Sequence, residues 1–93
     1  MANNLLISYD LYRPGQDYSS VIKAIKSLGS WAKVHLSLWY VKSGYSASEA
    51  SETVRSAMDK NDKLIVIDAT NNNAAWYNLG DEVSEFIKSH WHN

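Results

Sequence analysis

The sequence predicts a single α+β domain, and three observations lead to that class. The chain has 93 residues, which is enough for one domain, residues 1–93. Two short apolar runs, residues 4–10 and 63–69, have the length and composition of buried strands. Three segments, near residues 17–28, 47–59 and 81–91, carry apolar side chains at helical spacing. Alternating strands and helices in a chain of this length indicate one sheet with helices packed on it.

Composition and charge exclude several classes of protein. With 45% hydrophobic and 20% charged residues, the chain has the composition of a folded domain. The net charge of −1 disfavours a strongly basic domain that grips a nucleic-acid backbone along its length. The absence of cysteine excludes disulfides and thiolate metal sites. No signal peptide and no apolar stretch of membrane-spanning length are present, so we expect a cytoplasmic protein without a membrane partner.

The first half of the chain contains a strand, a turn, a helix and a second β segment. Residues 4–10 form the first strand, and a Pro-Gly pair ends it. Asp17 is the expected N-cap of the first helix and Gly29 its C-terminal cap. Residues 31–43 are rich in Val, Trp and Tyr, but their alternation slips by one residue near Ser37. Within residues 33–43, the slip indicates either one bulged strand or two strands joined by a tight hairpin.

The second half repeats the alternation of helix and strand. Ser46 and Glu49 form a capping box at the start of the second helix, and the strand at 63–69 follows it. Residues 74–77 are expected to form one helical turn, and Asp81 caps the last helix. The order matches the split βαβ, ferredoxin-like arrangement with an extra C-terminal helix. We therefore expect an antiparallel sheet with the helices on one face and the first and last strands side by side.

Several motifs resemble a known family. The segment Leu5-Leu6-Ile7-Ser8-Tyr9-Asp10-Leu11 resembles the first strand of the small subunit of the CRISPR spacer-acquisition complex, a ferredoxin-like homodimer. The segment Lys33-Val34-His35-Leu36-Ser37-Leu38-Trp39 is similar to the second-strand pattern of that family. The superfamily also contains the virulence-associated D ribonucleases. Nearly the whole chain is similar to the stand-alone SinR-like proteins, through Tyr9-Asp10-Leu11, Arg13-Pro14-Gly15, Tyr18, Trp31-Ala32, Ser37, Trp39, Asn61-Asp62-Lys63-Leu64, Ala75-Trp76 and Glu82-Val83-Ser84.

The resemblance implies a magnesium-dependent endonuclease that acts on RNA or DNA, with Asp10 as both catalytic residue and metal ligand. In this superfamily the corresponding aspartate lies near the dimer axis, where a divalent metal is thought to sit. A twofold-related copy would supply the second carboxylate, and carboxylates are hard oxygen ligands of the kind that Mg²⁺ prefers. The alternative is a structural role for Asp10, in which it caps nearby amides or pairs with Arg13 as the chain leaves the sheet.

Two further residues are auxiliary candidates beside Asp10. His35 is a general base if its strand neighbours the strand of Asp10, and otherwise it is a solvated side chain. Ser37 has no base at diagnostic spacing, so its hydroxyl is expected to satisfy backbone groups where the strand is irregular.

The competing prediction is a non-catalytic dimeric binding protein for a nucleotide or a protein partner. Four Trp, six Tyr and one Phe are available, and bases stack on such rings. The predicted core does not need Tyr12, Arg13, Tyr40 or Tyr45, so these residues form the predicted binding surface. Aromatic residues such as Trp39 are expected to cover the free face of the sheet in a homodimer.

Overall fold

The computed structural model of the chain describes residues 2–12 and 18–92. The expected Pro14-Gly15 turn, the expected N-cap Asp17 and the candidate Arg13 lie outside those residues. Within the described ranges no helix combines the length and the apolar character needed to cross a membrane. In chain order the elements are β1 (Asn3–Asp10), α1 (Ser19–Lys26), β2 (Gly29–His35), β3 (Leu38–Ser43), α2 (Ala47–Arg55), β4 (Lys63–Asp68) and α3 (Asp81–His90).

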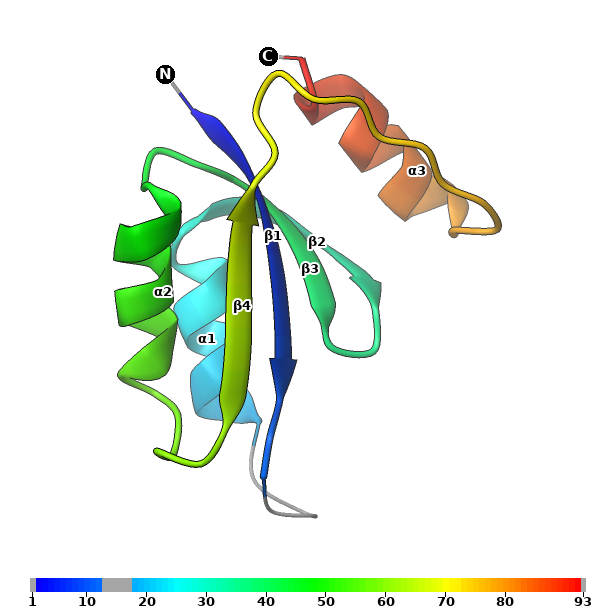
Figure 1. The fold of residues 1–93 in the computed structure, drawn as a ribbon. Helices are drawn as coiled ribbons and strands as arrows, with labels where there is room; N and C mark the ends of the chain where they lie inside the picture. The colour runs from blue at the N-terminus through cyan, green and yellow to red at the C-terminus, as the bar shows by residue number, and fades with distance from the viewer. Residues whose placement is uncertain (1, 13–17, 93) are drawn as a thin grey trace.

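A four-stranded antiparallel sheet forms the centre of the molecule, which confirms the α+β class (Figure 1). The strand order is β2-β3-β1-β4, and each neighbouring pair is antiparallel. As predicted, the first and last strands lie side by side, with Leu5 opposite Asp68 and Asp10 opposite Lys63. The order β1-α1-β2-β3-α2-β4 is compatible with the ferredoxin-like arrangement, and α3 is the additional C-terminal helix.

The larger core lies between the sheet and helices α1 and α2. Successive side chains of a strand point to opposite faces, so Leu5, Ile7 and Tyr9 share one face of β1. They pack with Val21 of α1, with Val54 of α2 and with the other members of one buried cluster. These helices bring their apolar stripes to that face, as their sequence spacing predicts.

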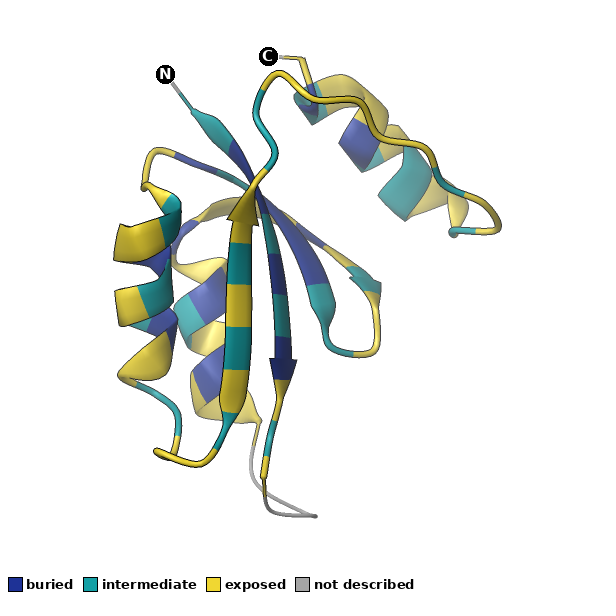
Figure 2. Cartoon of the chain, in the orientation of Figure 1, coloured by how far each residue is buried: buried dark blue, intermediate teal, exposed yellow. Residues whose placement is uncertain are grey.

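Helix α3 packs on the opposite face of the sheet, so the expectation that all three helices share one face is wrong (Figures 1 and 2). Ile87 and Trp91 form a second buried cluster with Tyr40 of β3, against Leu6 of β1 and Val34 of β2. The physical reason is that these three strand residues make the second face apolar, and an apolar sheet face is stable in water only when it is covered.

Residues 33–43 form a hairpin rather than one bulged strand. β2 ends at His35 and β3 begins at Leu38, and the turn places Leu36 at φ 25°, in the left-handed region. The register also shifts between Lys33 and His35, so the slip seen in the alternation is a real irregularity of β2. The hairpin begins earlier than predicted, because Gly29 pairs with Ser43 instead of capping α1.

Helix boundaries follow capping chemistry in α2 but differ from the prediction elsewhere. The capping box is confirmed, because the Glu49 amide donates to Ser46 Oγ at 3.1 Å and the Ser46 amide donates to Glu49 Oε1 at 2.9 Å. The bond from the Ser46 amide, and after it the Ser46 hydroxyl, lowers the pKa of the Glu49 carboxyl. Gly80 is the N-cap of α3, so Asp81 is its first residue and not its cap. Residues 74–77 form no helical turn, and Trp76 instead donates to Ser84 Oγ at 3.1 Å.

A buried polar network joins the end of α3 to the sheet. The Asn4 side-chain amide donates to the Trp91 carbonyl at 2.7 Å, and its oxygen accepts from the Tyr40 hydroxyl at 2.8 Å and from Lys42 Nζ at 2.9 Å. Tyr40 and Asn4 are fully buried. Burial raises the pKa of the Tyr40 phenol to about 12, because the phenolate would lose its hydration.

We expect the folded protein to lose stability as the pH rises from about 10 to about 12, the range set by Tyr40. The pKa of an unfolded tyrosine is about 10, so the folded state holds the Tyr40 proton more tightly than the unfolded state does. The contribution is complete below about pH 10 and is lost as the pH rises through about 12, by roughly 2–3 kcal/mol. Urea unfolding across this range measures it. The Tyr40→Phe variant should lose that part of the pH dependence, and an unchanged slope would contradict the assignment.

Candidate functional site

A pocket of about 410 Å³ opens at the end of the sheet where β1 ends and the β2–β3 hairpin turns. The Tyr9 amide donates to the Ser37 carbonyl at 3.4 Å, which joins the end of β1 to the hairpin. The start of α1 closes the third side. Three parts of the chain line the pocket. They are the end of β1 and the residue after it (Tyr9, Asp10, Leu11), the β2–β3 hairpin (Lys33, Leu36, Ser37) and the start of α1 (Tyr18, Ile22).

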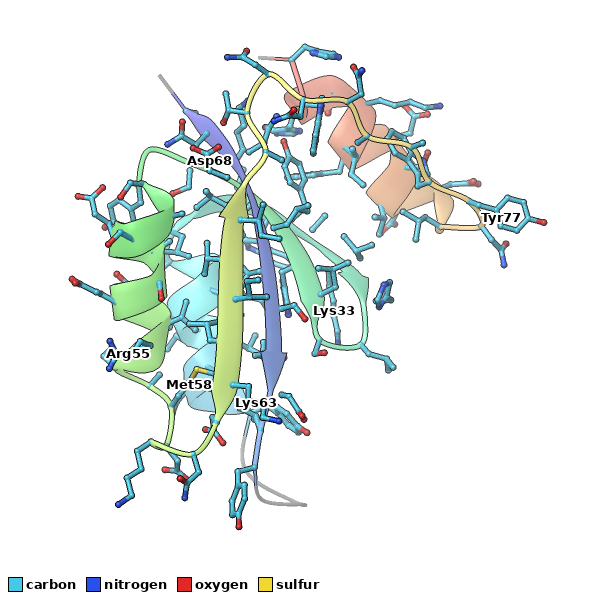
Figure 3. The ribbon with its side chains drawn as sticks, in the orientation of Figure 1. Lys33, Arg55, Met58, Lys63, Asp68 and Tyr77 are labelled. Carbon is cyan, nitrogen blue, oxygen red and sulfur yellow. The ribbon has the colours of Figure 1, made fainter. Side chains whose placement is uncertain are left out.

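One wall of this pocket is aromatic and carries a cation at its edge. The rings of Tyr9 and Tyr18 lie with their centroids 6.2 Å apart and tilted by 44°. Tyr9 is 6% exposed, whereas Tyr18 is 46% exposed. Lys33 is exposed on β2, with its ammonium 5.9 Å from the ring centroid of Trp39, and Figure 3 shows it beside the hairpin. The pocket therefore offers ring surface and positive charge together.

Asp10 is the exposed last residue of β1 and lies at the rim of this pocket. It also borders a shallower pocket that includes Ser8, Lys63 and Ile65. Within residues 2–12 and 18–92 its carboxylate has no hydrogen bond or ion pair. The amide-capping role that the sequence left open for Asp10 belongs to Asp62, which accepts from the Tyr12 amide at 2.7 Å.

Asp10 of one chain supplies only part of a metal site. In the part of the chain that the structure describes, no three His, Asp or Glu side chains converge in a metal-binding group. Mg²⁺ is commonly held by one or two carboxylates together with waters and substrate phosphates. A free, exposed carboxylate fits one position of that donor set, and the described residues of one chain place no second carboxylate in the same pocket.

Of the two auxiliary candidates, only Ser37 lies near Asp10. Ser37 lines the same pocket, and its carbonyl accepts from the Tyr9 amide. His35 is exposed on β2 and does not line the pocket. The condition for a general-base role, that its strand neighbours the strand of Asp10, is not met, because β3 lies between β1 and β2. His35 is therefore the solvated side chain of the alternative prediction.

The structure does not assemble the predicted aromatic surface. Tyr12 is 67% exposed and follows Asp10 in the chain, but Tyr40 is fully buried under α3 and cannot meet a partner. Tyr45 accepts at its carbonyl from the side chain of Asn3, so it lies beside the first residue of β1. That is the opposite end of the strand, roughly 24 Å away.

Sequence reasoning missed the rings and the cation that do meet beside Asp10. Tyr18 lies in the predicted first helix, residues 17–28, at helical spacing from Ile22 and Ile25, and that spacing favours a place in the core. In the structure Tyr18 is the N-cap residue of α1, at the end of the stripe, and its ring is half-exposed at the mouth of the pocket. Lys33 reaches the pocket only because β2 pairs with β3, and no local pattern reports that pairing.

Comparison with known proteins supplies no relative from which to transfer a function. No family model matches the chain, no curated protein matches it, and no solved structure matches it.

Proposed function

We propose that this chain is a magnesium-dependent endonuclease of the CRISPR-adaptation type, acting on RNA or DNA at the Asp10 end of its sheet. The observation that supports the proposal is the free, exposed carboxylate of Asp10 at the rim of a pocket that also contains Lys33 and Ser37. The sequence motifs around Asp10 point in the same direction. We expect the protein to work in the cytoplasm, as the sequence predicts.

Each polar residue of the site has a distinct part in this proposal. Asp10 is the residue that would hold the ion, and a bound Mg²⁺ supplies charge neutralisation at the phosphate and a more acidic water. Lys33 attracts the phosphate backbone to the pocket without itself transferring a proton. The backbone bond between Tyr9 and Ser37 holds β1 and the hairpin together, so that Asp10 and Lys33 keep a fixed relation.

The proposal requires a homodimer, because among the described residues that line the pocket one chain supplies a single carboxylate, that of Asp10. The sheet pairs Leu6 with Ile67 and Ser8 with Ile65, so both isoleucines lie on the same face as Asp10. Ile65 is 56% exposed and Ile67 is 47% exposed, because the cluster under α3 reaches Leu6 of β1 but includes no residue of β4. We propose that a second copy packs on this surface. Trp39 is not part of it, contrary to expectation, because its ring is buried in the core under α1 and α2.

Light scattering should therefore give about twice the chain mass of 10.5 kDa at micromolar concentration. The Ile65→Lys variant should be a folded monomer, since it places a charge in the proposed interface and disturbs no buried contact. A wild-type mass equal to that of one chain would contradict the dimer.

Incubation of purified protein with labelled RNA and DNA, single-stranded and double-stranded, tests the activity directly. Cleavage in Mg²⁺ or Mn²⁺ that stops in EDTA supports the proposal. Absence of cleavage of all four substrates with either metal would contradict it.

The second candidate function is a dimeric, non-catalytic binding protein for a nucleotide or a protein partner. One observation favours it: the pocket wall is formed by Tyr9, Tyr18 and Ile22, while no group of three metal-ligating side chains is present in the described residues. Binding of nucleic acid or of a mononucleotide without cleavage would select this candidate over the nuclease.

A further inference from the structure

We infer that the Tyr9–Tyr18 pocket takes one unpaired base, so that the ligand is a single strand or a free nucleotide and not an intact duplex. The inference rests on the proposed function and names the substrate class of the same site. Its evidence is the shape of the pocket, the exposure of one ring and the position of the charges.

The size and lining of the pocket suit a single planar ring system with its sugar. Its volume of about 410 Å³ falls within the usual range of roughly 300–1,000 Å³ for small-molecule sites. Tyr9, Tyr18, Ile22, Leu11 and Leu36 make most of the lining apolar. A base in a duplex has both ring faces covered by its neighbours, so only an unstacked base can use an aromatic wall of this kind.

Tyr18 is the ring that is available for stacking. Its side chain is 46% exposed, while its partner Tyr9 is buried behind it at a centroid distance of 6.2 Å. That distance leaves no room for a base between the two rings, so the base stacks on the outer face of Tyr18. The Tyr18 carbonyl accepts from the Ile22 amide at 2.9 Å, which fixes the backbone of Tyr18 at the start of α1. The stacking surface is therefore positioned before the ligand arrives.

Lys33 and Asp10 have opposite effects on the binding of a nucleotide phosphate. Lys33 lines the pocket and attracts an anion, and Asp10 at the rim repels it when no cation stands between them. In EDTA we therefore expect Asp10→Asn to strengthen nucleotide binding by about threefold and Lys33→Gln to weaken it by about the same factor. Nucleosides without phosphate should respond to neither substitution.

Fluorescence anisotropy in EDTA and low salt tests the inference without cleavage. The probes are a fluorescein-labelled single strand of about ten nucleotides, as RNA and as DNA, and the same strand within a blunt duplex. We expect the single strand to bind about tenfold more tightly or better, since each stacked base is worth about 1–3 kcal/mol, which is roughly 5- to 150-fold. Calorimetry with adenosine and cytidine monophosphates separates a free nucleotide from a strand as the ligand.

Tyr18→Ala should weaken binding of the single strand about fivefold or more, and Tyr18→Phe should keep it, because stacking needs the ring and not the hydroxyl. Tyr77→Ala is the matched control, since Tyr77 is 92% exposed and projects outward beside α3, away from the hairpin (Figure 3). Equal affinity for duplex and single strand, or no effect of Tyr18→Ala, would overturn the inference. If the duplex is also cleaved with metal, the nuclease proposal holds and the inference of an unpaired base is wrong. If no probe binds and none is cleaved, both the nuclease proposal and the inference are wrong.

Discussion

Asp10→Asn should reduce magnesium-dependent cleavage by about 100-fold or more while the fold stays intact. Removing a residue that only hydrogen-bonds a metal ligand typically lowers metal affinity or activity by about 10- to 100-fold. Removing the ligand itself should lower activity by at least as much. Asparagine keeps the shape of the side chain but removes the charge that holds the ion. Because Asp10 is exposed and makes no hydrogen bond or ion pair within the described residues, the substitution breaks no structural contact.

Initial cleavage rates with labelled RNA and DNA in Mg²⁺ measure the effect, and circular dichroism confirms the fold. Asp68→Asn is the control for loss of a strand-end carboxylate, because Asp68 is also the last residue of a strand but lies at the opposite end of β4 from Lys63, where it accepts from the Thr70 amide at 3.0 Å (Figure 3). Wild-type cleavage by Asp10→Asn would exclude Asp10 as a metal ligand and would favour the non-catalytic candidate.

Gly29→Ala should destabilise the protein by about 3 kcal/mol, a large part of the roughly 5–15 kcal/mol that small domains have. A Cβ at Gly29 would collide with the Lys42 carbonyl oxygen and would lie 3.1 Å from the Lys42 carbonyl carbon and 3.2 Å from Ser43 Cα. All three atoms belong to the backbone of β3, so no side-chain rotation relieves the contact. The β2–β3 hairpin has to separate at its open end.

Urea unfolding followed by tryptophan fluorescence measures this loss of stability. Gly44→Ala is the control, because a Cβ at Gly44 meets no atom within 4 Å. Gly44→Ala should be neutral or slightly stabilising, since alanine restricts the unfolded chain. Similar stability for Gly29→Ala and the wild type would show that β2 and β3 do not approach as closely as described.

Much of the fold could be predicted because its signals are local. The apolar runs of β1 and β4 lie where the sequence places them, and the Ser46–Glu49 capping box marks the start of α2. The antiparallel pairing of β1 with β4 follows from the order of strands and helices. The slip near Ser37 predicted an irregularity, but a bulge and a hairpin give the same slip, and only the turn at Leu36 distinguishes them.

The candidate site was less predictable, because its members come from separate parts of the chain. Asp10 stands out in the sequence, since it follows an apolar strand in a motif that resembles a known family. Lys33 and Tyr18 join it only after β2 pairs with β3 and α1 packs on the sheet. Tyr40 shows the converse case: the core predicted from the sequence does not include it, yet it is fully buried because α3 covers its face.

The sequence by itself determined which segments are strands, where α2 begins and that Asp10 is a candidate site residue. These features depend on neighbouring residues, and on apolar side chains repeating every two residues in a strand and every three to four in a helix. Only the tertiary structure decided which face each helix covers. Trp39 and Tyr40 are adjacent and therefore point to opposite faces, and both faces are apolar enough to bury a helix. Alternation along a strand specifies that two side chains diverge, but which of them meets α1, α2 or α3 depends on contacts between residues far apart in the chain.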